Sequence, residues 1–101
     1  MAVEGRVIEG GLRISGELDM AAVDDFRKLA ASMADPTHEV ILDIADLAFL
    51  DSAGLKVIVQ VADVACPQGL VLRWPRDNVL RVLEVLRVED IAGIRVERRT
   101  N

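Results

Sequence analysis

Residues 40–55 read VILDIADLAFLDSAGL, and this stretch decides the fold class of the chain. Its first part, from Val40 to Ile44, is apolar apart from one aspartate and rich in β-branched residues, which is typical of a buried strand. A short link, Ala45 to Asp51, is expected to follow. Ser52 then stands where a helix should begin, and residues 53–66 carry apolar side chains at helical spacing. The stretch therefore predicts a central strand followed directly by a helix.

The segment before this stretch predicts an antiparallel hairpin and a helix. Residues 2–9 and 12–15 are candidate strands, and Gly10-Gly11 is a tight-turn signal between them. Asp19 is the candidate cap of a helix that Asp35-Pro36 is expected to end. The inner face of this helix is expected to consist of Ala22, Val23, Phe26, Leu29, Ala30 and Met33.

The segment after the stretch repeats the alternation of strand and helix. Pro67-Gln68-Gly69 breaks the chain before a predicted strand at 70–74. A helix is expected to start at Pro75 and to run to about Arg87, before a last strand at 94–97. The inner face of this helix is expected to hold Val79, Val82, Leu83 and Leu86. The pattern favours an α/β fold with a mixed, mostly parallel sheet of about four or five strands and about three helices, whose strand order the sequence leaves open.

Size and composition indicate one small globular domain. The chain has 101 residues, of which 51% are hydrophobic and 29% charged, so we expect a single domain over residues 1–101. A lone cysteine, Cys66, excludes an internal disulfide and fits a reducing compartment. Met1 leads into no apolar signal segment, and no uncharged stretch is long enough to span a bilayer. We therefore expect a cytoplasmic protein without direct membrane insertion.

Charge and residue types disfavour nucleic-acid binding and catalysis. The formal net charge is −5, and the densest basic group, Arg95, Arg98 and Arg99, is diluted by Glu97. A polyanion would be repelled by this average charge. One histidine and one cysteine do not make a usual metal site, no glycine-rich loop is present to hold a phosphate, and Ser52 lacks a nearby base in the sequence. We expect no enzymatic activity, no cofactor and no metal.

Three segments, taken in order and at this spacing, resemble one protein family. Gly16-Glu17-Leu18-Asp19 closes the second predicted strand, residues 40–44 form the central strand, and Asp51-Ser52-Ala53-Gly54-Leu55 opens the next helix. The arrangement resembles STAS domains, particularly bacterial anti-sigma factor antagonists, over nearly the whole chain. The resemblance implies the STAS fold, although we expect no counterpart of the helix that family members commonly carry after the last strand.

The resemblance also implies a function. Ser52 matches the serine that an anti-sigma factor of the serine kinase type phosphorylates. In such systems the unmodified antagonist binds the anti-sigma factor and releases a sigma factor, and phosphorylation abolishes the binding. Asp19 and Asp51 match acidic positions near the same surface. Val57 and Val61 are added because they lie away from the expected core face of their helix. The candidate partner-binding residues are Asp19, Asp51, Ser52, Ala53, Gly54, Val57 and Val61. The alternative is a constitutive STAS subunit of a lipid-transport ATPase or of a stress-signalling scaffold.

The residues by themselves leave two questions open. The Ser52 hydroxyl could simply cap the helix that it precedes. Val57, Val61 and Val64 lie more than a quarter turn from the expected core face of that helix, so either another helix covers them or they form an exposed patch for a partner. The expected core face consists of Leu55, Ile58, Ala62 and Cys66.

Overall fold

The computed structural model describes residues 3–33 and 37–99. In chain order the elements are β1 (Glu4–Ile8), β2 (Gly11–Leu18), the 3-10 helix η1 (Met20–Ala22), α1 (Val23–Ala31), β3 (Val40–Leu50), α2 (Ser52–Ala65), β4 (Leu70–Arg73), α3 (Asp77–Val85), η2 (Val88–Asp90) and β5 (Ile94–Glu97). The predicted helix end at Asp35-Pro36 lies outside the described residues.

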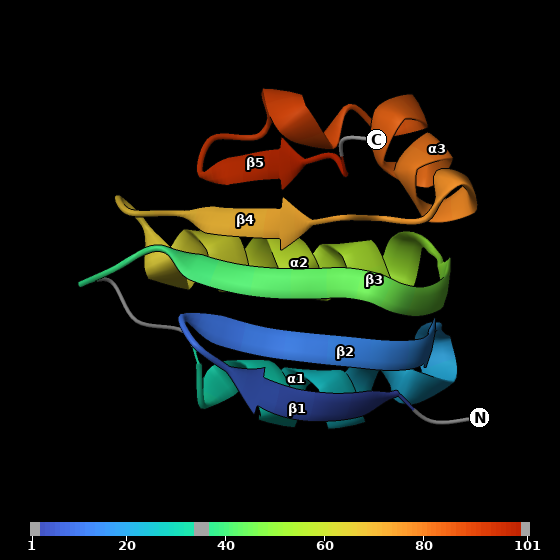
Figure 1. Ribbon diagram of the computed structural model, residues 1–101, viewed down its shortest axis with the longest axis horizontal. Coiled ribbons are helices and arrows are strands. Elements are labelled where there is room, and N and C mark those ends of the chain that lie inside the picture. The colour runs from blue at the N-terminus through green and yellow to red at the C-terminus, as the bar shows by residue number, and fades with distance from the viewer. Residues whose placement is uncertain (1–2, 34–36, 100–101) are drawn as a thin grey trace.

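The strands form one mixed sheet in the order β1-β2-β3-β4-β5 (Figure 1). β1 and β2 make the predicted antiparallel hairpin, and all the other neighbouring strands are parallel. Helices α1 and α2 cover one face of the sheet, while α3 lies beyond the carboxyl end of β4 (Figure 1). The α/β class and the mostly parallel sheet are therefore confirmed.

The register of the parallel strands aligns the apolar core. Leu12, Leu42, Leu72 and Val96 face one another across β2, β3, β4 and β5, and all four are buried. Fully burying one such side chain contributes about 1.5–3 kcal/mol. The row supplies the surface on which the helices pack.

The adjacent register position carries a row of charges across all five strands. From β1 to β5 it consists of Arg6, Arg13, Asp43, Arg73 and Glu97. Arg13 donates through Nη2 and Nε to Asp43 Oδ2, at 3.0 and 3.2 Å, and Arg73 pairs with Glu97 at 3.4 Å. Asp43 is only 1% exposed, so its charge depends on the Arg13 guanidinium.

β3 is longer than the sequence predicted. The segment from Ala45 to Leu50, expected to be a link, continues the strand and pairs with β2. Two register shifts in this pairing give β3 extra residues, and Asp43 Oδ1 accepts the Ala45 N–H at 3.0 Å at the first of them. The bulges break the alternation of apolar and polar side chains, which is why the pattern did not indicate a strand here.

Helix α2 begins where expected but ends one residue early. Cys66 has an extended backbone and is exposed, so it does not belong to the core face as predicted. Ala65 is buried instead. The change of backbone conformation at Cys66 turns its side chain away from the helix face, which spacing alone could not show.

Helix α3 is shorter than the sequence predicted. Pro75 lies outside it, because Trp74 adopts a left-handed φ of 58° and the helix begins only at Asp77. Val79 and Leu83 are buried as expected, whereas Leu86 is exposed because it is the C-cap residue, at which the helical backbone has ended.

The first turn of α2 packs directly against the end of β2. A Cβ atom on Gly54 would lie 2.6 Å from both the Cγ and the carbonyl oxygen of Leu18, closer than atoms can approach. Only glycine allows this contact. Gly54 thus sets how closely the start of α2 approaches the sheet.

We expect Arg13→Ala to lower the free energy of unfolding by about 2 kcal/mol, because Asp43 would stay buried without its cation. Urea unfolding measures the change. The control is Arg27→Ala, whose ion pair with Asp24 is exposed and should be worth less than about 0.5 kcal/mol. Equal losses for the two variants would contradict the structural role of the Arg13–Asp43 pair.

We expect Gly54→Ala to lower the free energy of unfolding by about 2 kcal/mol, because the added methyl group must push α2 away from Leu18. Ala53→Gly, one position earlier in α2, is the matched control and should cost only about 1 kcal/mol through helix propensity. A neutral or stabilising Gly54→Ala in the same denaturation experiment would show that the close contact does not constrain the fold.

Candidate functional site

The carboxyl ends of β2 and β3 bring the predicted site residues together. Leu18 and Leu50 are register partners, and each is followed by an aspartate. The Asp51 N–H donates to the Leu18 carbonyl at 3.3 Å, which joins the two chain segments just past the strands. Asp19 and Asp51 therefore lie at the same end of the sheet, where β2 and β3 end at the right of Figure 1.

Each aspartate caps the helix that follows it. Asp51 Oδ1 accepts the Gly54 N–H at 3.0 Å at the start of α2, and Asp19 Oδ1 accepts the Ala22 N–H at 3.1 Å at the start of η1. These bonds satisfy backbone donors that a helix start otherwise leaves unpaired. Capping by Asp19 confirms the prediction, whereas the cap of α2 is Asp51 and not Ser52.

Ser52 is the first residue of α2, and its side chain is exposed. Within residues 3–33 and 37–99 its hydroxyl makes no hydrogen bond. Because Asp51 performs the capping, the fold does not need the Ser52 hydroxyl. This hydroxyl is available to another molecule.

Two exposed apolar side chains flank this end of the sheet. Met20 follows the Asp19 cap and is 78% exposed, and Phe49 precedes the end of β3 and is 44% exposed. Sequence reasoning did not select either as a site residue. The only signal for Met20 was a large apolar residue placed directly after a capping aspartate.

The structure divides the other predicted contact residues by exposure. Gly54 and Val57 are buried, the latter to 2% exposure, while Ala53 and Val61 are half-buried. Helix α1 covers Val57, so the covering-helix interpretation holds for that residue. Val64 is 55% exposed.

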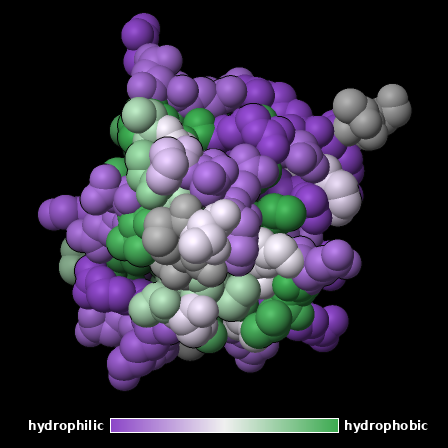
Figure 2. Space-filling view, turned by 90° about the vertical axis from the view of Figure 1, so that its left-hand side faces the viewer, coloured by the Kyte–Doolittle hydropathy of each residue, from purple (hydrophilic) through white to green (hydrophobic). Residues whose placement is uncertain are grey.

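A groove with mostly apolar walls runs between α1 and α2. Ala30 and Ala31 line it from α1, and Val57, Val61 and Val64 line it from α2. Figure 2 shows the end of the molecule opposite to Ser52, where apolar side chains lie in separate groups between polar ones.

The described residues show no group of three or more His, Cys, Asp or Glu side chains that could hold a metal ion. Over the same residues, no helix has both the length and the apolar character needed to cross a membrane. The histidine, His38, precedes β3, whereas Ser52 follows it, so the two residues lie at opposite ends of this 11-residue strand. The site therefore presents exposed apolar side chains, two carboxylates and a hydroxyl group.

The solved structures with a similar fold include anti-sigma factor antagonists. The unphosphorylated form of the anti-sigma factor antagonist SpoIIAA has a TM-score of 0.68 at 19% identity and covers 96% of this chain and 89% of its own. An anti-sigma factor antagonist from Mycobacterium paratuberculosis has the same TM-score and identity over 91% of this chain and 82% of its own. The phosphorylated form of the Bacillus cell fate determinant SpoIIAA has a TM-score of 0.62 at 17% identity, with 96% and 92% covered.

At these identities the structures establish a shared fold. No curated protein matches the sequence significantly. The family model described as "Mlab, STAS domain" matches residues 1–95, nearly the whole chain. The chain therefore belongs to the STAS domain family.

Proposed function

We propose that this STAS domain is an anti-sigma factor antagonist, that it binds its partner through the surface around Ser52, and that phosphorylation of Ser52 abolishes the binding. The observation that carries the proposal is the division of roles between Asp51 and Ser52. Asp51 caps α2, while the neighbouring hydroxyl is exposed and unbonded within the described residues. A modification there can change the surface without removing a contact that holds the fold.

The fold should tolerate a phosphate on Ser52. The phosphate would add about −1.5 to −2 charges at the first position of α2, a 14-residue helix. The unpaired N–H groups and the positive dipole at a helix start stabilise such a charge. Phosphorylation is therefore expected to leave the domain folded.

A phosphate on Ser52 should weaken the contact with a bound partner. The exposed Met20 and Phe49 favour a contact surface with an apolar part beside Ser52. Burying a new dianion there, next to Asp51, would cost several kcal/mol, on the order expected for an unpaired charge in an interface. Phosphorylation would thus act as the off-signal.

The proposed partner is an anti-sigma factor of the serine kinase type, which would transfer the γ-phosphoryl group of ATP to Ser52 Oγ with loss of the hydroxyl proton and release of ADP. The antagonist itself would act without catalysis, in the cytoplasm. The proposed contact surface consists of Asp19, Met20, Phe49, Asp51, Ser52 and Ala53, extended along α2 by Val61. Gly54 and Val57 would support this surface from below, because both are buried.

A constitutive STAS subunit of a larger assembly is the second candidate. The same surface would then bind whether or not Ser52 carries a charge. Only the response of binding to a negative charge at Ser52 separates the two functions.

We expect Ser52→Ala to bind the partner like wild type and Ser52→Glu to bind at least about tenfold more weakly, because the introduced carboxylate loses solvation in the interface. Wild type and both variants serve as baits in a native cell extract, and mass spectrometry identifies what they retain. The matched control is Ser32→Glu, which places the same charge on another exposed serine at the end of α1. Equal capture of one partner by wild type and Ser52→Glu would support the constitutive subunit instead.

We also expect Val61→Glu to weaken binding to the captured partner about tenfold or more, because it places a charge on the wall of the groove between α1 and α2. Val61 is half-buried, so its variant needs a thermal unfolding control. Val64→Glu, one turn further on and more exposed, should leave the melting temperature unchanged and weaken binding less. Full affinity of both variants would confine the contact surface to the Ser52 end of α2.

A further inference from the structure

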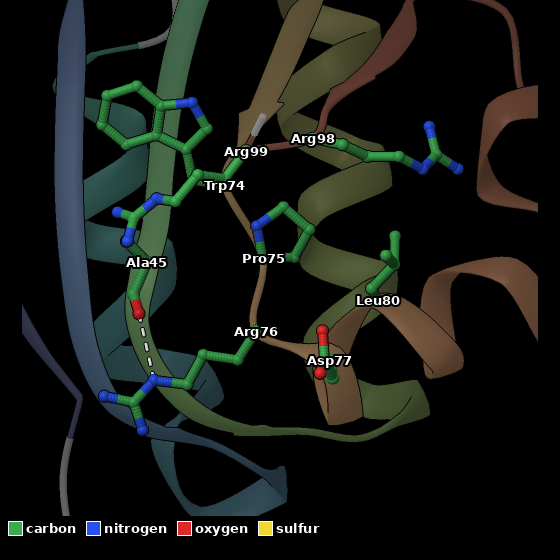
Figure 3. Close-up of a pocket in the computed structure, with 8 residues that line it drawn as sticks. All are labelled: Ala45, Trp74, Pro75, Arg76, Asp77, Leu80, Arg98 and Arg99. Atoms are coloured by element: carbon green, nitrogen blue, oxygen red, sulfur yellow. Dashed lines mark hydrogen bonds between the residues drawn. The ribbon is translucent and has the colours of Figure 1, made fainter. Parts of the chain in front are cut away.

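A second pocket lies where β4 leads into α3 (Figure 3). It encloses about 400 Å³, within the size range of small-ligand sites. Trp74, Arg76, Arg98 and Arg99 line it, together with Asp77. Three arginines around one pocket are unexpected in a chain whose formal net charge is −5.

Two of the three arginines have no carboxylate partner within the described residues. Arg98 donates to Glu89 at 2.6 Å and pairs with Glu84 at 3.7 Å, and the hydrogen bond to Glu89 is the main reason that its pKa is raised. Arg76 and Arg99, in contrast, form no ion pair within residues 3–33 and 37–99. Their charges are available for a ligand.

The structure holds both free guanidinium groups in place without neutralising them. Arg76 Nε donates to the Ala45 carbonyl at 3.0 Å, which leaves its Nη groups unbonded. The Arg99 guanidinium lies over the Trp74 ring at 5.1 Å from its centre. Such contacts reduce the side-chain entropy that a ligand would otherwise have to remove.

The free arginines point to the same side of the pocket. In Figure 3 the side chains of Arg76 and Arg99 extend on either side of Ala45, whereas Arg98 points away from them. The Asp77 carboxylate lies on the side of Leu80, away from the two guanidinium groups (Figure 3). The pocket therefore presents two cations without carboxylate partners at one wall, with Ala45 between them.

We propose that this pocket binds the phosphate group of a phosphate monoester through Arg76 and Arg99. Two guanidinium groups match a dianion in charge, and their planar N–H donors match the geometry of phosphate oxygens. Arg73 and Arg99 both lie over the Trp74 ring, at 5.2 and 5.1 Å, so the ring orients cations and is not free to stack on a ligand base. The site lies past the carboxyl end of β4, where open α/β sheets bind their ligands.

The phosphate could belong to a small metabolite or to a phosphorylated side chain of another protein. Inorganic phosphate, glycerol phosphate and a short phosphoserine peptide, each titrated into the ¹⁵N-labelled full chain, distinguish these sources. We expect saturable shifts of the Trp74 indole N–H and of the Arg76 and Arg99 Nε–H signals with each probe. Binding of the peptide about tenfold tighter than that of the two small probes would assign the site to a phosphoprotein, and equal binding would assign it to small phosphate esters.

Variants connect the shifts to the two arginines. Arg76→Gln and Arg99→Gln should each weaken phosphate binding about tenfold, through loss of one charge-assisted contact. Arg99 makes no hydrogen bond within the described residues, so Arg99→Gln tests the site even if Arg76→Gln disturbs α3. Arg81→Gln is the matched control, because Arg81 is exposed on the same helix and does not line the pocket.

Asp77→Asn tests the sign of the ligand charge. Removing the one negative charge among the named lining residues should tighten binding of an anion by a few-fold.

Absence of saturable shifts with all three probes would overturn the proposal. Weakening by Arg81→Gln equal to that by Arg76→Gln and Arg99→Gln would also overturn it, because the effect would then reflect net charge and not this pocket. Both outcomes leave the proposal for Ser52 untouched.

Discussion

The buried carboxylate of Asp43 is the constraint on which the arrangement of this domain depends. It lies in the middle of the sheet, in register with Arg13 on one side and Arg73 on the other. A shift of β2 or β4 by one residue would turn every side chain of that strand to the opposite face of the sheet. Asp43 would then have apolar side chains of that strand beside it in place of an arginine. The charged row therefore stabilises one register, and that register aligns the leucines on which α1 and α2 pack.

The same register determines what the end of the sheet presents. β3 contains two bulges, and together they bring the ends of β2 and β3 level, so that Leu18 faces Leu50. Asp19 and Asp51 follow directly, each as a helix cap. Because an aspartate already satisfies the start of α2, the adjacent serine is structurally dispensable. Capping and the exposed hydroxyl group thus belong to two different residues. A residue of this kind can be modified while the fold around it stays the same, which a phosphorylation switch requires.

The shortness of β4 also connects the two proposed sites. β4 ends at Arg73, opposite Asp43, so the second half of β3 has no strand partner on that side. Side chains at the start of α3 bind two of its carbonyl groups: Arg76 donates to Ala45 and Asn78 donates to Ala48 at 2.8 Å. Arg76 uses only its Nε–H for the Ala45 carbonyl, so it keeps its positive charge and the N–H donors of both Nη groups. The carboxyl end of the sheet thus presents an acidic, partly apolar surface at Ser52 and a basic pocket beside Trp74.

Local sequence was sufficient for the element types, the hairpin at Gly10-Gly11 and the Asp19 cap, because periodicity, capping and turn preferences act over a few residues. The grouping of Asp19 with Asp51 and Ser52 came from the resemblance to STAS domains. The second half of β3, the choice of Asp51 over Ser52 as cap, the burial of Val57 beneath α1 and the convergence of Arg76 with Arg99 were decided only by the tertiary structure. Each of these depends on contacts between segments distant in the chain. The second half of β3 forms a strand because it pairs with β2, although its pattern of apolar and polar residues is irregular. A face of α2 belongs to the core only where another element packs on it.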